Sequence, residues 1–480
     1  MRGSGRTGAR RDRQDMPQDT PAPSTTDHLP QRRDGASLTP ARTTAVAVIV
    51  AAATAALLFA AAFYPGWLSF DSSYQWWQAR SGEISNINGI GIVLLWQAAR
   101  WLHDGPQPLL LLQLALFWSG AALLALDAPV TARARLVLPL LLALAPASWL
   151  LAQIWSDAAL LALLVFAVAA IRRHRRDGSR VWFVAALAAL ALGLAQRHNA
   201  LFAVLPLLGW LCGVERRDAR RRRLGATITL AAVLLLVVHA TTAALTRQWF
   251  PVLPSLTLWD LSGMSVRQQR VLLPDYAIAP QSTVDDLASA YAAWSNTPLF
   301  ASPRAGVRYP FQPWPEADQQ RLRRHWLSTI TQHPQTYLAH RGELMAGLFG
   351  TRARELPPEL TYVPGPVQYR DNPAVAVPDG ALRRFALATF ERLRATPAFA
   401  AWPYLLIGIA AALRVRRRRD ARGAAVLWLI ASAWAYALPY TVLAPAAEFR
   451  YLLWSCIASL IAAWLAFATH RDEAIADLRD

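Results

Sequence analysis

The sequence predicts an all-α polytopic membrane protein that crosses the bilayer about ten times and has an α-rich extracytoplasmic domain. Three observations predict this class: 54% of the 480 residues are hydrophobic, these residues gather in separate blocks, and arginines follow several of the blocks. A helix of about 20 apolar residues is long enough to cross the hydrocarbon core of a bilayer. Because lipid offers the backbone no hydrogen-bond partners, each block is expected to be a helix.

The formal net charge of +18 does not indicate a nucleic-acid partner, because of where the basic residues lie. All 49 are arginines, and most stand in short runs directly after apolar blocks, where basic residues set the orientation of membrane helices. Cys212 and Cys456, the two cysteines, fall inside apolar segments, so neither a disulfide framework nor a thiolate metal site is expected. The partner that the composition predicts is the lipid bilayer.

The two ends of the chain are expected to be cytoplasmic tails. Residues 1–42 are rich in Arg, Pro, Thr, Asp and Gln and show no apolar periodicity, which predicts disorder. The first apolar block, 44–63, is longer than the core of a signal peptide, so we expect an uncleaved signal anchor. Cleavage after Ala60–Ala62 is the alternative. Residues 470–480 form the second tail.

The arginine runs fix the expected orientation of the crossings. With a cytoplasmic N-terminus, the runs at 172–180, 216–223 and 414–422 all fall in inner loops, whereas the short outer loops hold almost no arginine. This alternation predicts that both termini are cytoplasmic, with seven crossings in residues 43–246 and three in 398–469. The expected crossings are 44–63, 108–126, 134–152, 157–171, 181–195, 199–214, 225–246, 398–413, 423–443 and 450–469.

Two longer outer segments are expected between the crossings. The first, 64–107, contains the apolar stretch 90–102, which is short for a crossing and includes Arg100. Counting this stretch as a crossing would place every later arginine run outside, so we expect an interfacial or re-entrant helix there. The second, 247–397, is the expected extracytoplasmic domain, with an amphipathic helix at 316–331.

Polar side chains gather at the expected outer ends of the crossings. Because polar groups are costly at membrane depth, their positions point to a functional site. Asp71 follows the first crossing, Asp157 opens the fourth, and a polar turn at 197–199 joins the fifth to the sixth. A further group enters the tenth crossing, so four segments converge on one side of the membrane. The candidate site residues are Asp71, Gln75, Asp157, Arg197, His198, Asn199, Glu448, Arg450 and Tyr451.

Each of these groups also has a purely structural interpretation. Asp71 and Asp157 could cap helix N-termini, where a carboxylate accepts hydrogen bonds from free backbone N–H groups. Arg197 could belong to an ordinary turn, and Arg450 could pair only with Glu448. The chain has no H-E-x-x-H, C-x-x-C or phosphate-binding G-x-x-x-x-G-K-[ST] motif, so nothing in the sequence predicts an ATP-driven mechanism.

Four motifs, in order along the chain, resemble a poorly characterised bacterial branch of the GT-C-fold membrane glycosyltransferases. The first is Y-P-G-x-x-x-x-D-S-x-x-Q, here Tyr64 to Gln75, and the second is R-H-N-A-L-F, here Arg197 to Phe202. The third is W-x-x-x-I-x-x-H-P-x-x-Y-L-x-H-R, here 326–341, and the fourth is F-R-Y, here 449–451. The resemblance implies a GT-C-like fold in a bacterial inner (plasma) membrane.

The resemblance also implies an activity: transfer of a sugar from a polyprenyl-phosphate donor to a cell-envelope acceptor, a glycan, lipid or protein. Asp71 would be the base or a metal ligand, and Asp157 would bind a divalent cation (Mg or Mn) or orient the acceptor. Arg197 and Arg450 would hold the leaving phosphate, with His198 assisting. The other residues implied to bind substrate are Gln75, Asn199, Glu448 and Tyr451.

The sequence departs from this family at two places and leaves other functions open. Many GT-C enzymes have paired acidic residues in the first loop, whereas Ser72 follows Asp71, and 86–91 lacks the histidine and proline of similar proteins. A transporter or flippase of a lipid-linked saccharide is one alternative, although broken helices with polar groups at the midplane are typical of that class. A non-catalytic protein of envelope assembly is another.

Overall fold

All regular structure in the computed structural model is helical, which confirms the predicted all-α class for the residues that the structure describes, 40–352 and 356–469. The two predicted tails lie outside these residues, except for 40–42, which belong to the first helix. The first helix, α1, therefore begins at Pro40, earlier than the sequence pattern predicts.

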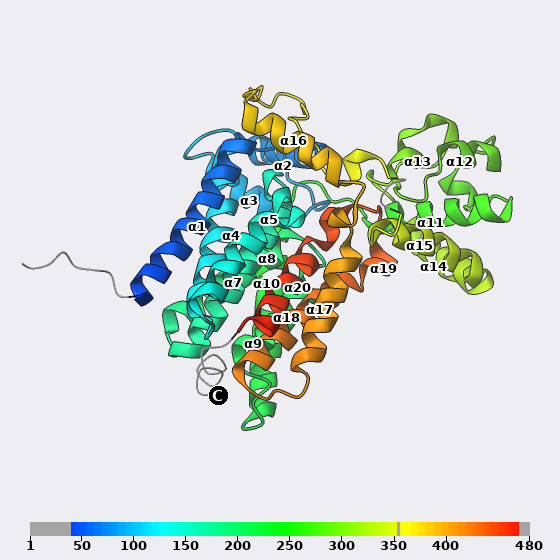
Figure 1. Cartoon of the computed structure of the whole chain (residues 1–480). Coiled ribbons are helices and arrows are strands. Elements are labelled where there is room, and N and C mark those ends of the chain that lie inside the picture. Colours follow the sequence, from blue (N-terminus) through cyan, green and yellow to red (C-terminus); the bar gives the residue numbers. More distant parts are fainter. Residues whose placement is uncertain (1–39, 353–355, 470–480) are drawn as a thin grey trace, which may run out of the picture.

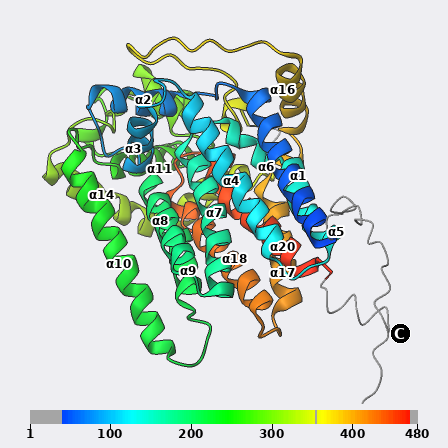
Figure 2. The same cartoon turned by 90° about the vertical axis from the view of Figure 1, so that its left-hand side faces the viewer.

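The apolar blocks of the sequence all fold as helices and pack into one bundle (Figures 1 and 2). The helices of this bundle are α1 (Pro40–Phe63), α4 (Gln107–Asp127), α5 (Ala132–Leu144), α6 (Pro146–Trp149), α7 (Ser156–Asp177), α8 (Arg180–Gln196), α9 (Ala200–Cys212), α10 (Arg220–Leu245), α17 (Ala401–Val415), α18 (Ala421–Ala437), α19 (Tyr440–Leu443) and α20 (Leu453–Phe467).

Fewer helices than the predicted ten are long and apolar enough to cross a membrane by length and composition. Among the described residues there are five, and a sixth results if α5 and the segment after it, which meet at a bend of 63°, form one span. The five are Arg42–Phe63, Gln107–Asp127, Arg220–Leu245, Ala421–Leu443 and Phe449–Phe467. The other apolar helices include α8, α9 and α17, which have 10–17 residues. The number ten therefore stays a prediction.

The centre of the bundle is formed by α7 and α20. α7 packs between α4 and α8, and α20 packs between α17 and α18. Nearly every residue from Ser156 to Ile171 is buried, and alanines alternate with leucines there, which lets neighbouring helices approach closely. α10 lies at the edge of the bundle, where Figure 2 shows it beside α8 and α9, and most of its surface is exposed.

Residues 247–397 form a separate group of helices, the 247–397 domain, beyond one end of the bundle (Figure 1). The amphipathic helix predicted at 316–331 is α14. α16 stands apart from the others and lies across the bundle end, against α1. The helices of this domain are α11 (Leu253–Gln268), α12 (Val284–Ala290), α13 (Thr297–Ala301), α14 (Glu316–Gln332), α15 (Pro334–Leu348) and α16 (Ala381–Leu393).

The predicted short helix of the first loop is α3 (Ile90–Ala99), which follows α2 (Phe70–Ser81). α3 packs closely on the C-terminal end of α8 because Gly89 and Gly91 have no side chains. A Cβ at Gly89 would lie 2.2 Å from the Gln196 carbonyl oxygen, so only glycine fits this position. The contact fixes the first loop to the bundle end at which α8 ends; below, this end is called the site end.

Candidate functional site

The backbone at 67–68 holds the starts of α2 and α7 together at the site end. Trp67 exchanges backbone hydrogen bonds with residues 152–154, just before α7, and Leu68 does so with residues 365–367 of the 247–397 domain. The N···O distances of these bonds run from 2.8 to 3.1 Å. Three segments that are far apart in sequence therefore meet at the residues that lead into α2.

Asp71 lies in the first turn of α2 but does not cap it. The cap is Ser69, whose hydroxyl accepts from the Ser72 backbone N–H at 3.4 Å and from the Trp155 indole N–H at 2.8 Å. The carboxylate of Asp71 is therefore free to point elsewhere, and its side chain is 40% exposed. Capping by Asp71 alone, one of the structural interpretations, is not what the structure shows.

Arg450 joins Asp71 to Glu448. Its Nη2 donates to Asp71 Oδ2 at 2.8 Å, and its Nε forms an ion pair with Glu448. The guanidinium also lies over the ring of Trp155, 4.8 Å from the ring centroid. Because the Arg450 side chain is only 11% exposed, these contacts hold one cation between two carboxylates and an aromatic face. Arg450 thus does not pair only with Glu448.

Arg197 and Asp157 form a third ion pair close by. Arg197 follows the last residue of α8, and its Nη1 donates to Asp157 Oδ2 at 2.6 Å. The Asp157 side chain is 2% exposed, and its Oδ1 has no hydrogen-bond partner among the described residues. Because breaking a buried ion pair is strongly destabilising, the pair of Arg197 with Asp157 is expected to hold the starts of α7 and α9 together.

Tyr451 connects the two arginines. Its ring lies 5.0 Å from the Arg197 guanidinium and 5.5 Å from that of Arg450. The ring stacks on Tyr440 with centroids 5.1 Å apart, and its hydroxyl donates to Glu448 at 3.4 Å. Three ion pairs and a tyrosine thus form one unit, called here the charged cluster. Its members are Asp71, Asp157, Arg197, Glu448, Arg450 and Tyr451.

The three remaining candidate residues lie around this cluster with different contacts. Asn199 accepts from Arg197 Nε at 3.4 Å. His198 turns to the first loop, where its Nε2 lies 3.1 Å from the Asn86 carbonyl oxygen, and partial desolvation by the neighbouring protein lowers the pKa of its imidazole. Gln75, one turn after Asp71 on α2, is buried, and its Oε1 has no partner in the described part of the chain.

The side chains at this site do not fit a divalent cation well. Asp71 and Asp157, the predicted metal ligands, each bond to an arginine. No group of three or more His, Cys, Asp and Glu side chains that could hold a metal ion occurs among residues 40–352 and 356–469. Two guanidiniums within the cluster would also repel a cation. The metal stays a prediction, and no step proposed below uses it.

Two aromatic residues of the site were not among the predicted ones. Trp155 faces Arg450 and also supports the Ser69 cap, while Tyr440 stacks on Tyr451. Trp155 precedes Asp157 by two residues, which was a usable signal. Tyr436 and Tyr440, one helical turn apart at the end of an apolar block, were another.

A second buried group of charges lies in the 247–397 domain. Asp260 of α11 is fully buried, lies at hydrogen-bond distance, 2.9 Å, from His340 Nε2, and forms an ion pair with Arg341 Nη2 at 2.6 Å, both from α15. Its other oxygen accepts from the Trp326 indole N–H at 3.0 Å. The Tyr291 hydroxyl lies 2.7 Å from His340 Nδ1. The third predicted motif, 326–341, therefore supplies three members of this group.

This group holds the segment that leads to the charged cluster. Arg341 Nη1 donates to the Ala444 carbonyl oxygen at 2.8 Å. Two backbone bonds lie alongside, from Asn296 N–H to Pro445 at 3.0 Å and from Ala447 N–H to Trp294 at 2.8 Å. Glu448 follows directly. The 247–397 domain therefore fixes the approach to Glu448 and Arg450, although it contributes no side chain to the charged cluster.

The arrangement can bind an anion and accept a proton at the same place. Two partly buried guanidiniums offer several N–H donors to a phosphate, and the partly exposed Asp71 carboxylate can act as a base. No protein-family model, curated protein or solved structure matches this chain. The chemistry of the charged cluster must therefore carry the functional argument.

Proposed function

We propose that this protein is a GT-C-like membrane glycosyltransferase that moves a sugar from a polyprenyl-phosphate donor to a cell-envelope acceptor at the extracytoplasmic face. The observation that carries the proposal is the contact of Arg450 with Asp71. This contact joins an arginine, a side chain suited to bind phosphate, to a partly exposed carboxylate, a group suited to act as a base, at the end of a bundle of apolar helices. Such a site suits a substrate whose charged group lies at the membrane surface.

In the proposed reaction the donor phosphate takes the place of the Asp71 carboxylate on Arg450. The released carboxylate accepts the proton of an acceptor hydroxyl, whose oxygen then bonds to the anomeric carbon of the sugar. The bond from that carbon to the phosphate oxygen breaks, and the polyprenyl phosphate leaves with the electron pair. Arg450 and Arg197 stabilise the charge that develops on the leaving phosphate.

An apolar cavity of about 380 Å³ supports a lipid-linked substrate. It lies between α3, α4, α7 and α8. Asp157 lies at the site end of α7, and Arg197 directly follows the site end of α8. Leu112 and Leu192 on its rim are 39% and 40% exposed, so hydrocarbon can enter from the side. The lining residues are Ile92, Leu95, Leu109, Leu112, Gln113, Leu116, Ala159, Leu163, Phe166, Ala185, Ala188, Ala189 and Leu192.

The two ends of α7 support the proposed orientation. Asp157 lies in its first turn, whereas Arg173 and Arg176 pair with Asp127 near its other end. At a rise of about 1.5 Å per residue, roughly 25 Å separate these positions, close to the thickness of a hydrocarbon core. With ten crossings, the arginine-rich end faces the cytoplasm of a bacterial inner membrane, and the site end faces outward.

Transfer can be tested with purified protein in vesicles that contain a panel of polyprenyl-phosphate sugars and an envelope lipid extract as acceptor. Asp71→Asn should lower the rate of transfer by about 10²- to 10⁴-fold, the usual contribution of a general base. Asp104→Asn is the matched control, because Asp104 is 37% exposed and pairs with Arg80 and Arg100 outside the charged cluster. Full transfer by Asp71→Asn, or movement of the lipid-linked sugar across the vesicle without transfer, would contradict the proposal.

A further inference from the structure

α16 has three distinct faces, one of which is apolar and exposed. Its inner face carries Arg383 and Phe390, both buried against the bundle end. Its polar face carries Arg384 and, seven residues later and so on the same side of the helix, Glu391. On the third face Phe385 is 70% exposed, which is unusual for a phenylalanine in water. An amphipathic helix with such a face normally lies against another apolar surface.

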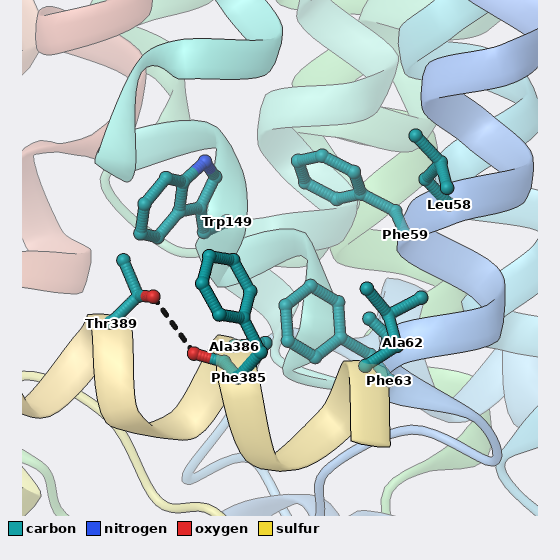
Figure 3. A pocket seen from close by; sticks show the side chains of 9 residues that line it. Leu58, Phe59, Ala62, Phe63, Trp149, Phe385, Ala386 and Thr389 are labelled. Atoms are coloured by element: carbon teal, nitrogen blue, oxygen red, sulfur yellow. Dashed lines mark hydrogen bonds between the residues drawn. The ribbon is translucent and has the colours of Figure 1, made fainter. Parts of the chain in front are cut away.

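The exposed face of α16 continues the surface of α1, which is one of the candidate membrane spans. Leu58 of α1 is 53% exposed and lies across a groove from Phe385, as Figure 3 shows. Trp149 of α6 closes the groove from the side. The apolar surface therefore runs without interruption from a membrane span onto a helix that lies across the end of that span.

The groove itself is apolar and of a size that hydrocarbon can fill. Its volume is about 150 Å³, and because its walls are almost entirely apolar, hydrocarbon fills it more favourably than water does. The one hydroxyl on its wall, that of Thr389, donates to the Phe385 carbonyl oxygen at 2.8 Å and so is satisfied within α16. The lining residues are Leu58, Phe59, Ala62, Phe63, Trp149, Leu382, Phe385, Ala386 and Thr389.

We infer that α16 is an in-plane helix of the leaflet at the site end, and that the groove between α1, α6 and α16 holds an acyl chain of a membrane phospholipid. Leu382 and Phe385 would enter the boundary between headgroups and acyl chains. Arg384, 61% exposed and paired with the exposed Asp379, lies on the face turned to the headgroups. This binding site is separate from the proposed reaction and does not depend on it.

The lining points to a bilayer phospholipid rather than to the proposed donor. None of the residues of the charged cluster lines this groove, whereas the cavity between α3, α4, α7 and α8 shares two helices with that cluster. The groove also opens beside Leu58 on a membrane span, where phospholipid is the most abundant apolar molecule. A second copy of the chain could cover the groove only by displacing that phospholipid.

The position of α16 can be tested by spin labelling in vesicles of phosphatidylethanolamine and phosphatidylglycerol. Single cysteines at Phe385 and Arg384 are introduced after Cys212 and Cys456 have been replaced by alanine. The label at 385 should be accessible to oxygen and protected from a water-soluble nickel chelate, and the label at 384 should show the reverse. Equal access of the chelate to both labels, or protection of 385 from both reagents by a second copy, would overturn the inference.

The acyl chain can be tested with a phosphatidylglycerol that carries a photoreactive group in one chain. Irradiation should join it to the peptides of α16 and α1, and Ala386→Trp, which fills the groove, should remove most of this adduct. Ala388→Trp is the matched control, because Ala388 is exposed and does not line the groove. An adduct that survives in Ala386→Trp, or that polyprenyl phosphate displaces, would overturn the assignment to phospholipid.

Discussion

Replacing Arg341 by glutamine should loosen the segment that leads to Glu448 without unfolding the bundle. Arg341 is 3% exposed and holds two partners, the Asp260 carboxylate at 2.6 Å and the Ala444 carbonyl at 2.8 Å. Removing one member of a buried ion pair typically costs about 3–5 kcal/mol. Asp260 keeps its contacts with His340 and Trp326, so we expect the lower value, about 3 kcal/mol, in the free energy of local opening.

A change of this size should speed local opening on the order of 100-fold, since each ~1.4 kcal/mol is a factor of ten. The assay is amide hydrogen exchange of the peptides that contain Asn296 and Ala447, whose N–H groups bond across the two segments. Arg267→Gln is the control: its pair with Glu343 joins the same two helices, α11 and α15, but both side chains are partly exposed. That pair should contribute at most about 1 kcal/mol.

Unchanged exchange at these amides in Arg341→Gln, or a change no larger than in Arg267→Gln, would contradict a positioning role for Arg341. Exchange that rises to the same extent in α7 and α20 would contradict it equally, because the effect would then be global unfolding. A local effect would show that the 247–397 domain positions Glu448 and Arg450. The same variant should then also slow sugar transfer while its abundance in the membrane stays normal.

Three further predictions concern the charged cluster, the first loop and the topology. Arg197→Lys keeps the charge but loses the planar fork that bonds Asp157, so KM for the polyprenyl-phosphate donor should rise by roughly 10- to 100-fold, as expected for about 1.5–3 kcal/mol of a charged hydrogen bond, in steady-state transfer assays. A KM equal to that of the unaltered protein would contradict a phosphate-binding role. Partial desolvation by the neighbouring protein lowers the pKa of His198, so the unfolded chain binds more protons than the folded chain as the pH falls from about 7 to 5, and the thermal stability should fall as the pH falls. His198→Gln should weaken this dependence, measured as the shift in the midpoint of thermal unfolding; an identical shift would show that other groups cause it. A reporter fused at about residue 300 should report an extracytoplasmic location, and a cytoplasmic signal there would reverse the proposed orientation.

The convergence of four distant segments could be predicted from the sequence because it follows from topology. Once the arginine runs assign the loops to sides, Asp71, Asp157, Arg197 and Arg450 all fall at one membrane surface. The structure brings these four into one cluster. The helical class followed from the same physical constraint, that a backbone in lipid must satisfy its own hydrogen bonds.

The pairing within the cluster could not be predicted, because it depends on packing between helices. Nothing local indicates that Arg450 selects Asp71, 379 positions away, in addition to the adjacent Glu448. The stacking of Tyr451 on Tyr440 and the anchoring of Ala444 by Arg341 are tertiary contacts of the same kind. The break between α5 and α6, inside the predicted crossing 134–152, could not be located from composition either, because apolar residues continue through it.

The direct test of the central claim is a lipid analysis of cells that lack this protein. The account predicts that one polyprenyl-phosphate sugar accumulates, and that the unaltered protein, but not Asp71→Asn at equal abundance, returns it to its normal level. An unchanged pool of polyprenyl-phosphate sugars, or full restoration by Asp71→Asn, would contradict sugar transfer at the charged cluster.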